Sequence, residues 1–272
     1  MLSSTLAQRH ARQLLDARRA GKLLPPFSAI EALSLADGYA VAKAVTDLRI
    51  AGGEQMVGRK ISFVNKRHAA QGVALGWTPL FDGTVRYVED NHGAQSLSGA
   101  LQPRIQPEIV FKLAITPAAD ASMEELTDCI EWMAHGIEIL SCPYPDWQFE
   151  IADAVAAFGF HGALLISEPK LLSMASRHHL AQILSAASVS LSCSEGAGFG
   201  LRAAGFGSDV HGSPVHALHA LQRLLVSQGA GLQAGEIVST GAWIEACPVT
   251  AGQTWSTAFS GVSLEGLTIS FV

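Results

Sequence analysis

Residues 104–111 read RIQPEIVF and residues 136–140 read GIEIL, and these two segments decide the fold. Each places amide or carboxylate side chains among β-branched and aromatic residues, a pattern typical of largely buried strands. Side chains two apart on a strand leave the same face, so Gln106 and Glu108 share a face. Glu138 stands between two isoleucines and points away from them. The sequence therefore predicts that Glu108 and Glu138 converge, with Gln106 beside them.

A short helix is predicted between these two segments. Ser122 and Glu125 form a capping-box signature, and apolar residues continue at helical spacing to about Ala134. Pro107 cannot donate a ladder hydrogen bond, so residues 105–115 are predicted to form an edge strand or to carry a bulge. A strand, a helix and a second strand in so short a span indicate a βαβ-like unit whose strands lie close together.

The chain outside this unit divides into a helical start and a β-rich remainder. Helical spacing predicts helices over residues 3–20 and 33–50, and from residue 57 onward short apolar runs alternate with Gly, Pro, Asp and Asn. We therefore expect a helical N-terminal region at 1–53 and a β-rich body at 54–272, together one structural unit of the α+β class. Further strands are predicted at 163–167, 189–194, 236–239, 254–259 and 264–271, with one helix at 214–228.

Composition excludes several classes of protein. The 272 residues are 49% hydrophobic and only 15% charged, which excludes extended disorder. A net charge of −6 argues against a nucleic-acid partner. The four cysteines lack disulfide-framework or zinc-finger spacing, the arginine-rich N-terminus lacks the apolar core of a secretory signal, and no apolar run is long enough to span a membrane. We expect a cytoplasmic protein that binds neither nucleic acid nor membrane.

The predicted oxygen cluster suits a metal ion. Two carboxylates and an amide oxygen, from Glu108, Glu138 and Gln106, are ligands that a hard divalent cation such as Mg²⁺ or Mn²⁺ accepts. Solvent-facing residues on a strand would show the same spacing, so spacing alone leaves both interpretations open.

The segments around this cluster resemble the fumarylacetoacetate hydrolase superfamily, in particular its branch of 2-hydroxypenta-2,4-dienoate hydratases and 4-oxalocrotonate decarboxylases. The resemblance implies a mixed β-roll or barrel-like body with a small helical N-terminal region, and it extends from about residue 35 to the C-terminus. The matching segments, in the family's order, are 58–60 (GRK), 102–111 (QPRIQPEIVF), 136–140 (GIEIL), 146–147 (DW) with 153–156 (DAVA), and 236–242 (EIVSTGA).

The same resemblance assigns roles to residues. It implies a metal site at Gln106, Glu108 and Glu138, with Lys60 beside the substrate as a proton donor or acceptor. Gln106 departs from the family pattern, because an amide replaces a carboxylate and the site loses one negative charge that would attract a cation. Residues 157–158 read AF where the family carries Asp-Asn.

Four further positions are candidate site residues. Asp82 lies at a position shifted from that of the family's aspartate, and His161 is a candidate acid or base, with a structural histidine as the alternative. Arg104 is a candidate clamp for a substrate carboxylate, or else a salt-bridge partner. The hydroxyl of Thr240 and the N–H of Gly241 form a candidate carboxylate cradle, or else an ordinary turn.

The resemblance implies a divalent-metal-dependent lyase, either a hydratase or a decarboxylase. Its substrate would be a short 2-oxo or 2-hydroxy-dienoic acid, such as 2-hydroxypenta-2,4-dienoate in aromatic meta-cleavage catabolism. A C–C bond hydrolase of acylpyruvates and a catalytically impaired paralogue or partner subunit are the alternatives, and Gln106 keeps the last of these open. Sheet edges that need cover, together with the resemblance, also predict a homo-oligomer.

Overall fold

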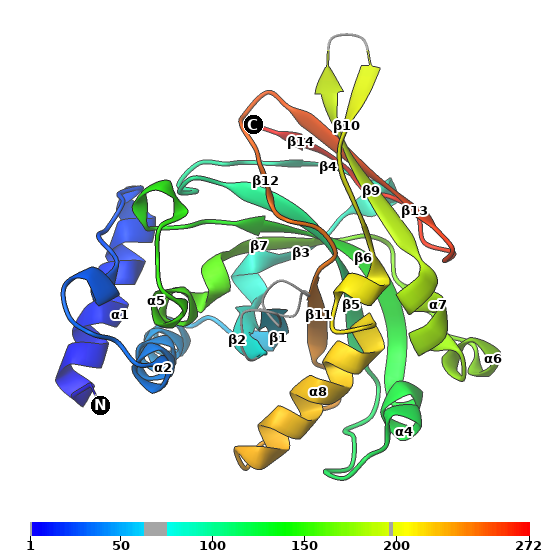
Figure 1. Ribbon diagram of the computed structural model, residues 1–272, viewed down its shortest axis with the longest axis horizontal. Coiled ribbons are helices and arrows are strands. Elements are labelled where there is room, and N and C mark those ends of the chain that lie inside the picture. The colour runs from blue at the N-terminus through cyan, green and yellow to red at the C-terminus, as the bar shows by residue number, and fades with distance from the viewer. Residues whose placement is uncertain (1, 63–74, 196–197) are drawn as a thin grey trace.

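The computed structural model describes residues 2–62, 75–195 and 198–272 and shows a curled, mixed β-sheet with helices on two sides (Figure 1). The larger sheet has nine strands in the order β2-β1-β11-β5-β6-β7-β3, with β12 paired to β5 and β8 paired to β6. The α+β class and the barrel-like body predicted from the sequence are confirmed. Its strands are β1 (Met56–Ser62), β2 (Gly76–Phe81), β3 (Val85–Tyr87), β5 (Arg104–Leu113), β6 (Ile130–Leu140), β7 (His161–Ile166), β8 (Lys170–Leu171), β11 (Ile237–Ala242) and β12 (Cys247–Pro248).

A second sheet of five strands covers one face of the first. Its order is β10-β9-β13-β14-β4, and the β9–β10 hairpin projects from the body (Figure 1). Ile109 and Phe111 of β5 are fully buried in one apolar cluster with Leu191 and Ile269 of this second sheet. One face of β5 is therefore committed to the core, which leaves the other face for polar side chains. The strands are β4 (His92–Gln95), β9 (Ser188–Glu195), β10 (Gly198–Phe206), β13 (Thr254–Ser260) and β14 (Thr268–Phe271).

The N-terminal helices α1 (Ser4–Ala20) and α2 (Leu35–Ala51) form as predicted and pack beside α5 (Ile151–Ala156). Caps explain their limits: Ser3 caps the start of α1, Gly21 ends it in the left-handed conformation, and Ser34 with Asp37 forms a capping box for α2. Within the described residues no helix is both long and apolar enough to cross a membrane. The other α-helices are α4 (Met123–Asp128), α6 (Met174–Arg177), α7 (Leu180–Ala186) and α8 (Pro214–Ser227).

The prediction of a helix as far as Ala134 is wrong. The capping box at Ser122 forms as expected, but α4 ends at Asp128, and Ile130 already begins β6. Residues 130–134 pair with β5, so burial in the sheet overrides their helical spacing. The two strands also run antiparallel rather than as a βαβ unit.

The prediction that Pro107 marks an edge strand is also wrong, because β5 lies inside the sheet between β11 and β6. The Pro107 carbonyl accepts a hydrogen bond from the Trp243 N–H at 3.2 Å. The backbone nitrogen and oxygen of one strand residue face the same neighbouring strand, so the Pro107 nitrogen, which has no hydrogen to donate, also faces β11. Strand β11 shifts its register against β5 at this place, between Ser239 and Ala242. The irregularity expected at the proline therefore lies in the neighbouring strand.

Gly58 allows β1 and β11 to approach each other closely. The two strands run parallel with Gly58 opposite Ile237, and a Cβ added at Gly58 would lie 2.0 Å from the Ile237 carbonyl oxygen. Lys60 stands two residues farther along β1, on the same face as Gly58, and pairs with Ser239 of β11.

We expect Gly58→Ala to destabilise the protein by about 1–3 kcal/mol, because the backbones must separate to admit the methyl group. Gly83→Ala is the matched control, since a Cβ there would meet only a Glu54 oxygen at 3.8 Å. Urea unfolding of both variants measures the difference. Equal stability of the two variants would contradict the close approach.

Candidate active site

Two carboxylates and one amide meet on the face of the sheet opposite the core. The β5–β6 register places Gln106 directly opposite Glu138, with Glu108 next to it on β5. Gln106 Nε2 donates to Glu108 Oε1 at 2.9 Å and to Glu138 Oε2 at 2.7 Å. The two carboxylates are almost completely buried. The sequence-based expectation that these three side chains lie together therefore agrees with the structure.

Lys60 joins this cluster from β1. Its Nζ lies 2.7 Å from Glu138 Oε2 and donates to the carbonyl of Gly159 at 3.0 Å. Strand β11 runs between β1 and β5, and it carries Ser239 opposite Lys60. The small side chains of Ser239 and Gly241 leave room for the lysine to reach across β11.

His161, at the start of β7, contacts the cluster from the other side. Its Nδ1 lies 2.8 Å from Glu138 Oε1 and its Nε2 lies 3.0 Å from Thr84 Oγ1. Burial, together with the positive charge of Lys60, holds the pKa of His161 well below its ordinary value. The ring is therefore neutral. A carboxylate only accepts, so Nδ1 carries the proton and donates to Glu138. Nε2 then faces the Thr84 hydroxyl, whose single proton is shared between Nε2 and the Phe81 carbonyl 2.9 Å away.

Glu108 is surrounded by donors from β11. Its Oε2 accepts from the Ser239 hydroxyl and from the Gly241 N–H at 3.1 Å. Burial and the negative charge of Glu138 raise the pKa of Glu108 to about 8, and Lys60 opposes this shift. Two like charges in one buried site thus favour a shared positive partner.

The remaining predicted residues lie around this cluster in different ways. Arg104 lies on the cluster's face of β5, and its guanidinium stacks 4.3 Å from the Trp147 ring. In the part of the chain that the structure describes, no carboxylate lies within ion-pair distance of Arg104. The Thr240 hydroxyl donates to the Ile109 carbonyl at 2.9 Å, so it supports β5.

Asp82 is not brought into the cluster. It is exposed at the end of β2, where its carboxylate accepts from the N–H groups of Gln55 and Gly83 at 3.1 and 2.9 Å. These contacts hold the turn that leads to Thr84.

Two residues of the site, Ser239 and Thr84, were not predicted from the sequence. Ser239 lies in the matched segment 236–242, and its register opposite Lys60 could have been inferred had β1 and β11 been paired correctly. Thr84 follows no local pattern, because it contacts His161, which is distant in the chain.

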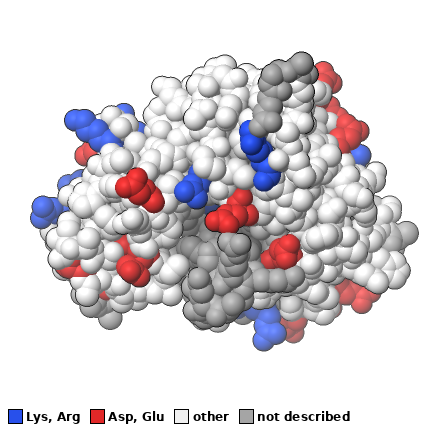
Figure 2. All heavy atoms as spheres, turned by 45° about the horizontal axis from the view of Figure 1, so that its top comes forward, with Lys and Arg blue, Asp and Glu red and all other residues white. Residues whose placement is uncertain are grey.

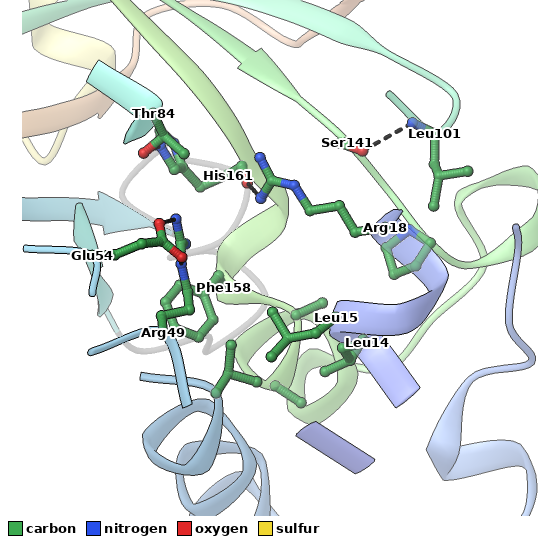
Figure 3. Close-up of a pocket in the computed structure, with 14 residues that line it drawn as sticks. Leu14, Leu15, Arg18, Arg49, Glu54, Thr84, Leu101, Ser141, Phe158 and His161 are labelled. Carbon is green, nitrogen blue, oxygen red and sulfur yellow. Dashed lines mark hydrogen bonds and ion pairs between the residues drawn. The ribbon is translucent and has the colours of Figure 1, made fainter. Parts of the chain in front are cut away.

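A cavity of about 280 Å³ adjoins the cluster, between the N-terminal helices and the sheet. His161 and Thr84 form one wall, and Leu14 and Arg18 of α1 form the opposite one (Figure 3). On the face of the molecule in Figure 2, basic and acidic side chains are interspersed, so the described atoms of that face offer no basic stripe for a nucleic acid.

The oxygens of Glu108, Glu138 and Gln106 can bind a hard divalent cation if the terminal amide of Gln106 rotates. Glu108 and Glu138 each direct an oxygen to the same point, now filled by the amide nitrogen of Gln106. A half-turn of the terminal amide would bring the carbonyl oxygen of Gln106 to that point as a third ligand. A cation therefore competes with two hydrogen bonds, and it offsets the repulsion between the two carboxylates.

Comparison with known proteins gives a consistent group of relatives. No family model matches the chain. A 2-hydroxyhexa-2,4-dienoate hydratase of Comamonas testosteroni is 26% identical, over 96% of this chain and 97% of its own length. A 4-oxalocrotonate decarboxylase of a Pseudomonas species is also 26% identical, over 90% of both chains.

Solved structures confirm the fold. A 4-oxalocrotonate decarboxylase from Pseudomonas putida, complexed with magnesium and adipate, superposes with a TM-score of 0.87 and 20% identity, covering 100% of this chain and 99% of that one. A fumarylpyruvate hydrolase from Pseudomonas aeruginosa, in complex with Mn²⁺ and pyruvate, reaches a TM-score of 0.53 at 14% identity, over 79% of this chain and 88% of that one.

The raised pKa of Glu108 predicts how stability depends on pH. Between its ordinary pKa of 4.5 and about 8, the folded protein holds a proton that the unfolded chain has lost, so stability falls as pH rises. Burial lowers the pKa of His135 to about 4 and also lowers the pKa of His161. Below their ordinary pKa of 6.5, the unfolded chain binds protons that the folded protein does not, so these two histidines make stability rise with pH. The window that isolates Glu108 is therefore pH 6.5–8.

Across that window, in the presence of a chelator, we expect the free energy of unfolding to fall by roughly 2 kcal/mol. Glu108→Gln should remove this slope, whereas Glu131→Gln, a change at a partly exposed residue paired with Lys112, should keep it. Urea unfolding at several pH values measures it. Parallel slopes in wild type and Glu108→Gln would show that Glu108 ionises normally.

Proposed function

We propose that this chain, a homologue of the 2-keto-4-pentenoate hydratases and 4-oxalocrotonate decarboxylases with the fold of the fumarylacetoacetate hydrolase family, is a divalent-metal-dependent lyase. Its substrate is a short 2-oxo or 2-hydroxy-dienoic acid. The observation that carries the proposal is the convergence of Glu108 and Glu138 on one buried point beside Lys60. That arrangement occurs in a chain that aligns with these lyases over nearly its whole length.

Glu108, Glu138 and, after rotation of its amide, Gln106 would hold Mg²⁺ or Mn²⁺. Such a cation would supply Lewis-acid stabilisation of the negative charge that develops on a 2-oxo acid during the reaction. Structures with this fold contain magnesium, calcium or manganese, which supports a divalent ion without selecting one.

Lys60 is the residue placed to move a proton. Its ammonium is oriented by Glu138 and by the Gly159 carbonyl, so an N–H can be directed at a carbon or oxygen of the bound acid. His161 holds the second oxygen of Glu138 and is itself held by Thr84, so its part is to orient that carboxylate.

Hydration and decarboxylation can share this site. Protonation of a dienol gives an α,β-unsaturated 2-oxo acid to which water adds, and departure of carbon dioxide from a dicarboxylic 2-oxo acid gives the same kind of enolate. Both routes need the charge on the 2-oxo oxygen to be stabilised and one proton to be delivered.

The outer residues have supporting parts in this proposal. Arg104 clamps a substrate carboxylate through the N–H edge that its stacking on Trp147 leaves open. Gly241 positions Glu108, Thr240 fastens β11 to β5, and Asp82 holds the turn before Thr84.

We also propose that the protein is a cytoplasmic homo-oligomer. Strand β10 ends the second sheet and exposes Phe199, Leu201 and Phe206. Such an edge is usually covered, which supports the homo-oligomer expected from the sequence, and light scattering tests it. A cytoplasmic location fits a metabolic enzyme of this kind.

One observation favours a second candidate, a catalytically impaired paralogue or partner subunit. The Gln106 amide and the Lys60 ammonium already satisfy the inner oxygens of both carboxylates, so the pair is stable without a cation. Such a protein would bind divalent ions weakly and would turn over none of the dienoates.

An ultraviolet assay with a small panel of dienoic and 2-oxo-enedioic acids tests the function. We expect activity that a chelator abolishes and Mg²⁺ restores. Lys60→Met should lower kcat/KM by about 100-fold or more, the contribution typical of a proton-transfer group. Lys112→Met, which removes a partly exposed lysine paired with Glu131, should leave activity unchanged. An inactive wild type with Mg²⁺ present would favour the impaired paralogue.

The charge at position 106 predicts how metal and chelating ligand depend on each other. With Gln106, two carboxylates leave the cation short of negative charge, and a bound oxalate restores it, so each should tighten the other's binding. Gln106→Glu should tighten Mg²⁺ binding without oxalate and shrink this coupling. Gln233→Glu, which adds the same charge at an exposed position, is the control. Titration calorimetry measures both constants, and an unchanged affinity in Gln106→Glu would show that Gln106 is not a ligand.

A further inference from the structure

The cavity beside the cluster contains a positive charge without a counterion. Its volume of about 280 Å³ equals that of roughly nine liquid waters at about 30 Å³ each, which suits a small organic acid. The wall formed by α1 directs Arg18 across the cavity toward His161 (Figure 3).

Arg18 is held in place, yet most of its donors are unused. Its two terminal nitrogens donate to the carbonyls of His161 and Gly162, at 3.2 and 2.8 Å. A guanidinium has five N–H donors, so three remain for another partner. Among residues 2–62, 75–195 and 198–272, no carboxylate lies within ion-pair distance of Arg18, and its side chain remains exposed.

The second arginine of the cavity is already neutralised. Arg49 forms a two-bond ion pair with Glu54, at 2.9 and 2.5 Å, and its guanidinium stacks 4.0 Å from the Phe81 ring. Among the arginine and glutamate side chains of the lining, Arg18 is therefore left as the cation that no carboxylate pairs with.

We propose that Arg18 binds the distal carboxylate of a dicarboxylic 2-oxo acid whose 2-oxo end reaches the Glu108–Glu138 cluster. This inference rests on the proposed function and specifies its substrate class. His161 connects the two ends, because its carbonyl accepts from Arg18 and its ring contacts Glu138. An extended six-carbon chain spans about 6 Å by ordinary bond lengths, a little less than the reach of two extended residues. A monocarboxylic acid would leave the charge of Arg18 unpaired.

Two saturated acids isolate the distal group. 2-Oxoadipate and 2-oxohexanoate share the 2-oxo acid end and differ only in a terminal carboxylate or methyl group. With Mg²⁺ present, we expect wild type to bind 2-oxoadipate about 10- to 100-fold more tightly in titration calorimetry, the effect of one charge-assisted pair. Arg18→Gln should remove this preference and leave the affinity for 2-oxohexanoate unchanged.

Arg19→Gln is the matched control, since Arg19 is the next residue of α1, its side chain is 81% exposed and it pairs with Asp16. This variant should keep the full preference. Arg18→Lys should keep part of it, because a lysine retains the charge without the two-pronged geometry. If Arg18→Gln disturbs the packing of α1, a lower melting temperature and weaker 2-oxohexanoate binding will reveal it, and Arg18→Lys then decides.

Oxalate, which occupies only the metal-chelating end, should compete with 2-oxoadipate for binding. Equal affinity of wild type for the two acids, a preference that survives in Arg18→Gln, or simultaneous binding of oxalate and 2-oxoadipate would each overturn the proposal. These readouts need no turnover. A protein that prefers 2-oxoadipate through Arg18 but converts no dienoate would therefore refute the lyase and retain the carboxylate site.

Discussion

The burial of Glu108 and Glu138 beside each other is the constraint on which the rest of the structure depends. Two carboxylates removed from water and placed side by side repel each other, and each must find donors or a cation. Gln106, Lys60 and His161 supply them on one side, and the loop end of β11 supplies the Ser239 hydroxyl and the Gly241 N–H on the other. These donors come from β1, β5, β7 and β11, so the cluster forms only when the four strands have joined the sheet.

The order of the strands brings the residues of the cluster together on the face of the sheet opposite the core. β5 and β6 carry the acids and lie in the middle of the larger sheet, where their opposite face packs against the second sheet. β11 lies between β5 and β1, and its small residues let Lys60 approach the acids. The register shift in β11 beside Pro107 accommodates a residue that cannot donate to the ladder, so an irregular strand and a buried proline occur together.

The N-terminal helices complete the site rather than form a separate layer. Asp153 of α5 accepts from the backbone and the hydroxyl of Ser28, and Arg18 of α1 donates to carbonyls of β7. Residues of α1 and α2 line a cavity next to His161, and Arg18 places a positive charge in it. A fold shared with distant lyases can thus differ in specificity through residues outside the sheet.

Features that depend on residues close together in the chain could be predicted from the amino-acid sequence. Alternation along a strand put Gln106 and Glu108 on one face and turned Glu138 away from its isoleucines, and the capping box of Ser122 and Glu125 set the start of α4. Packing between distant segments sets the contacts of Lys60, His161 and Arg18, the end of α4 at Asp128 and the interior position of β5. The reason is physical: side-chain direction depends on neighbours in the chain, whereas strand order and partner choice depend on which distant surfaces are buried together.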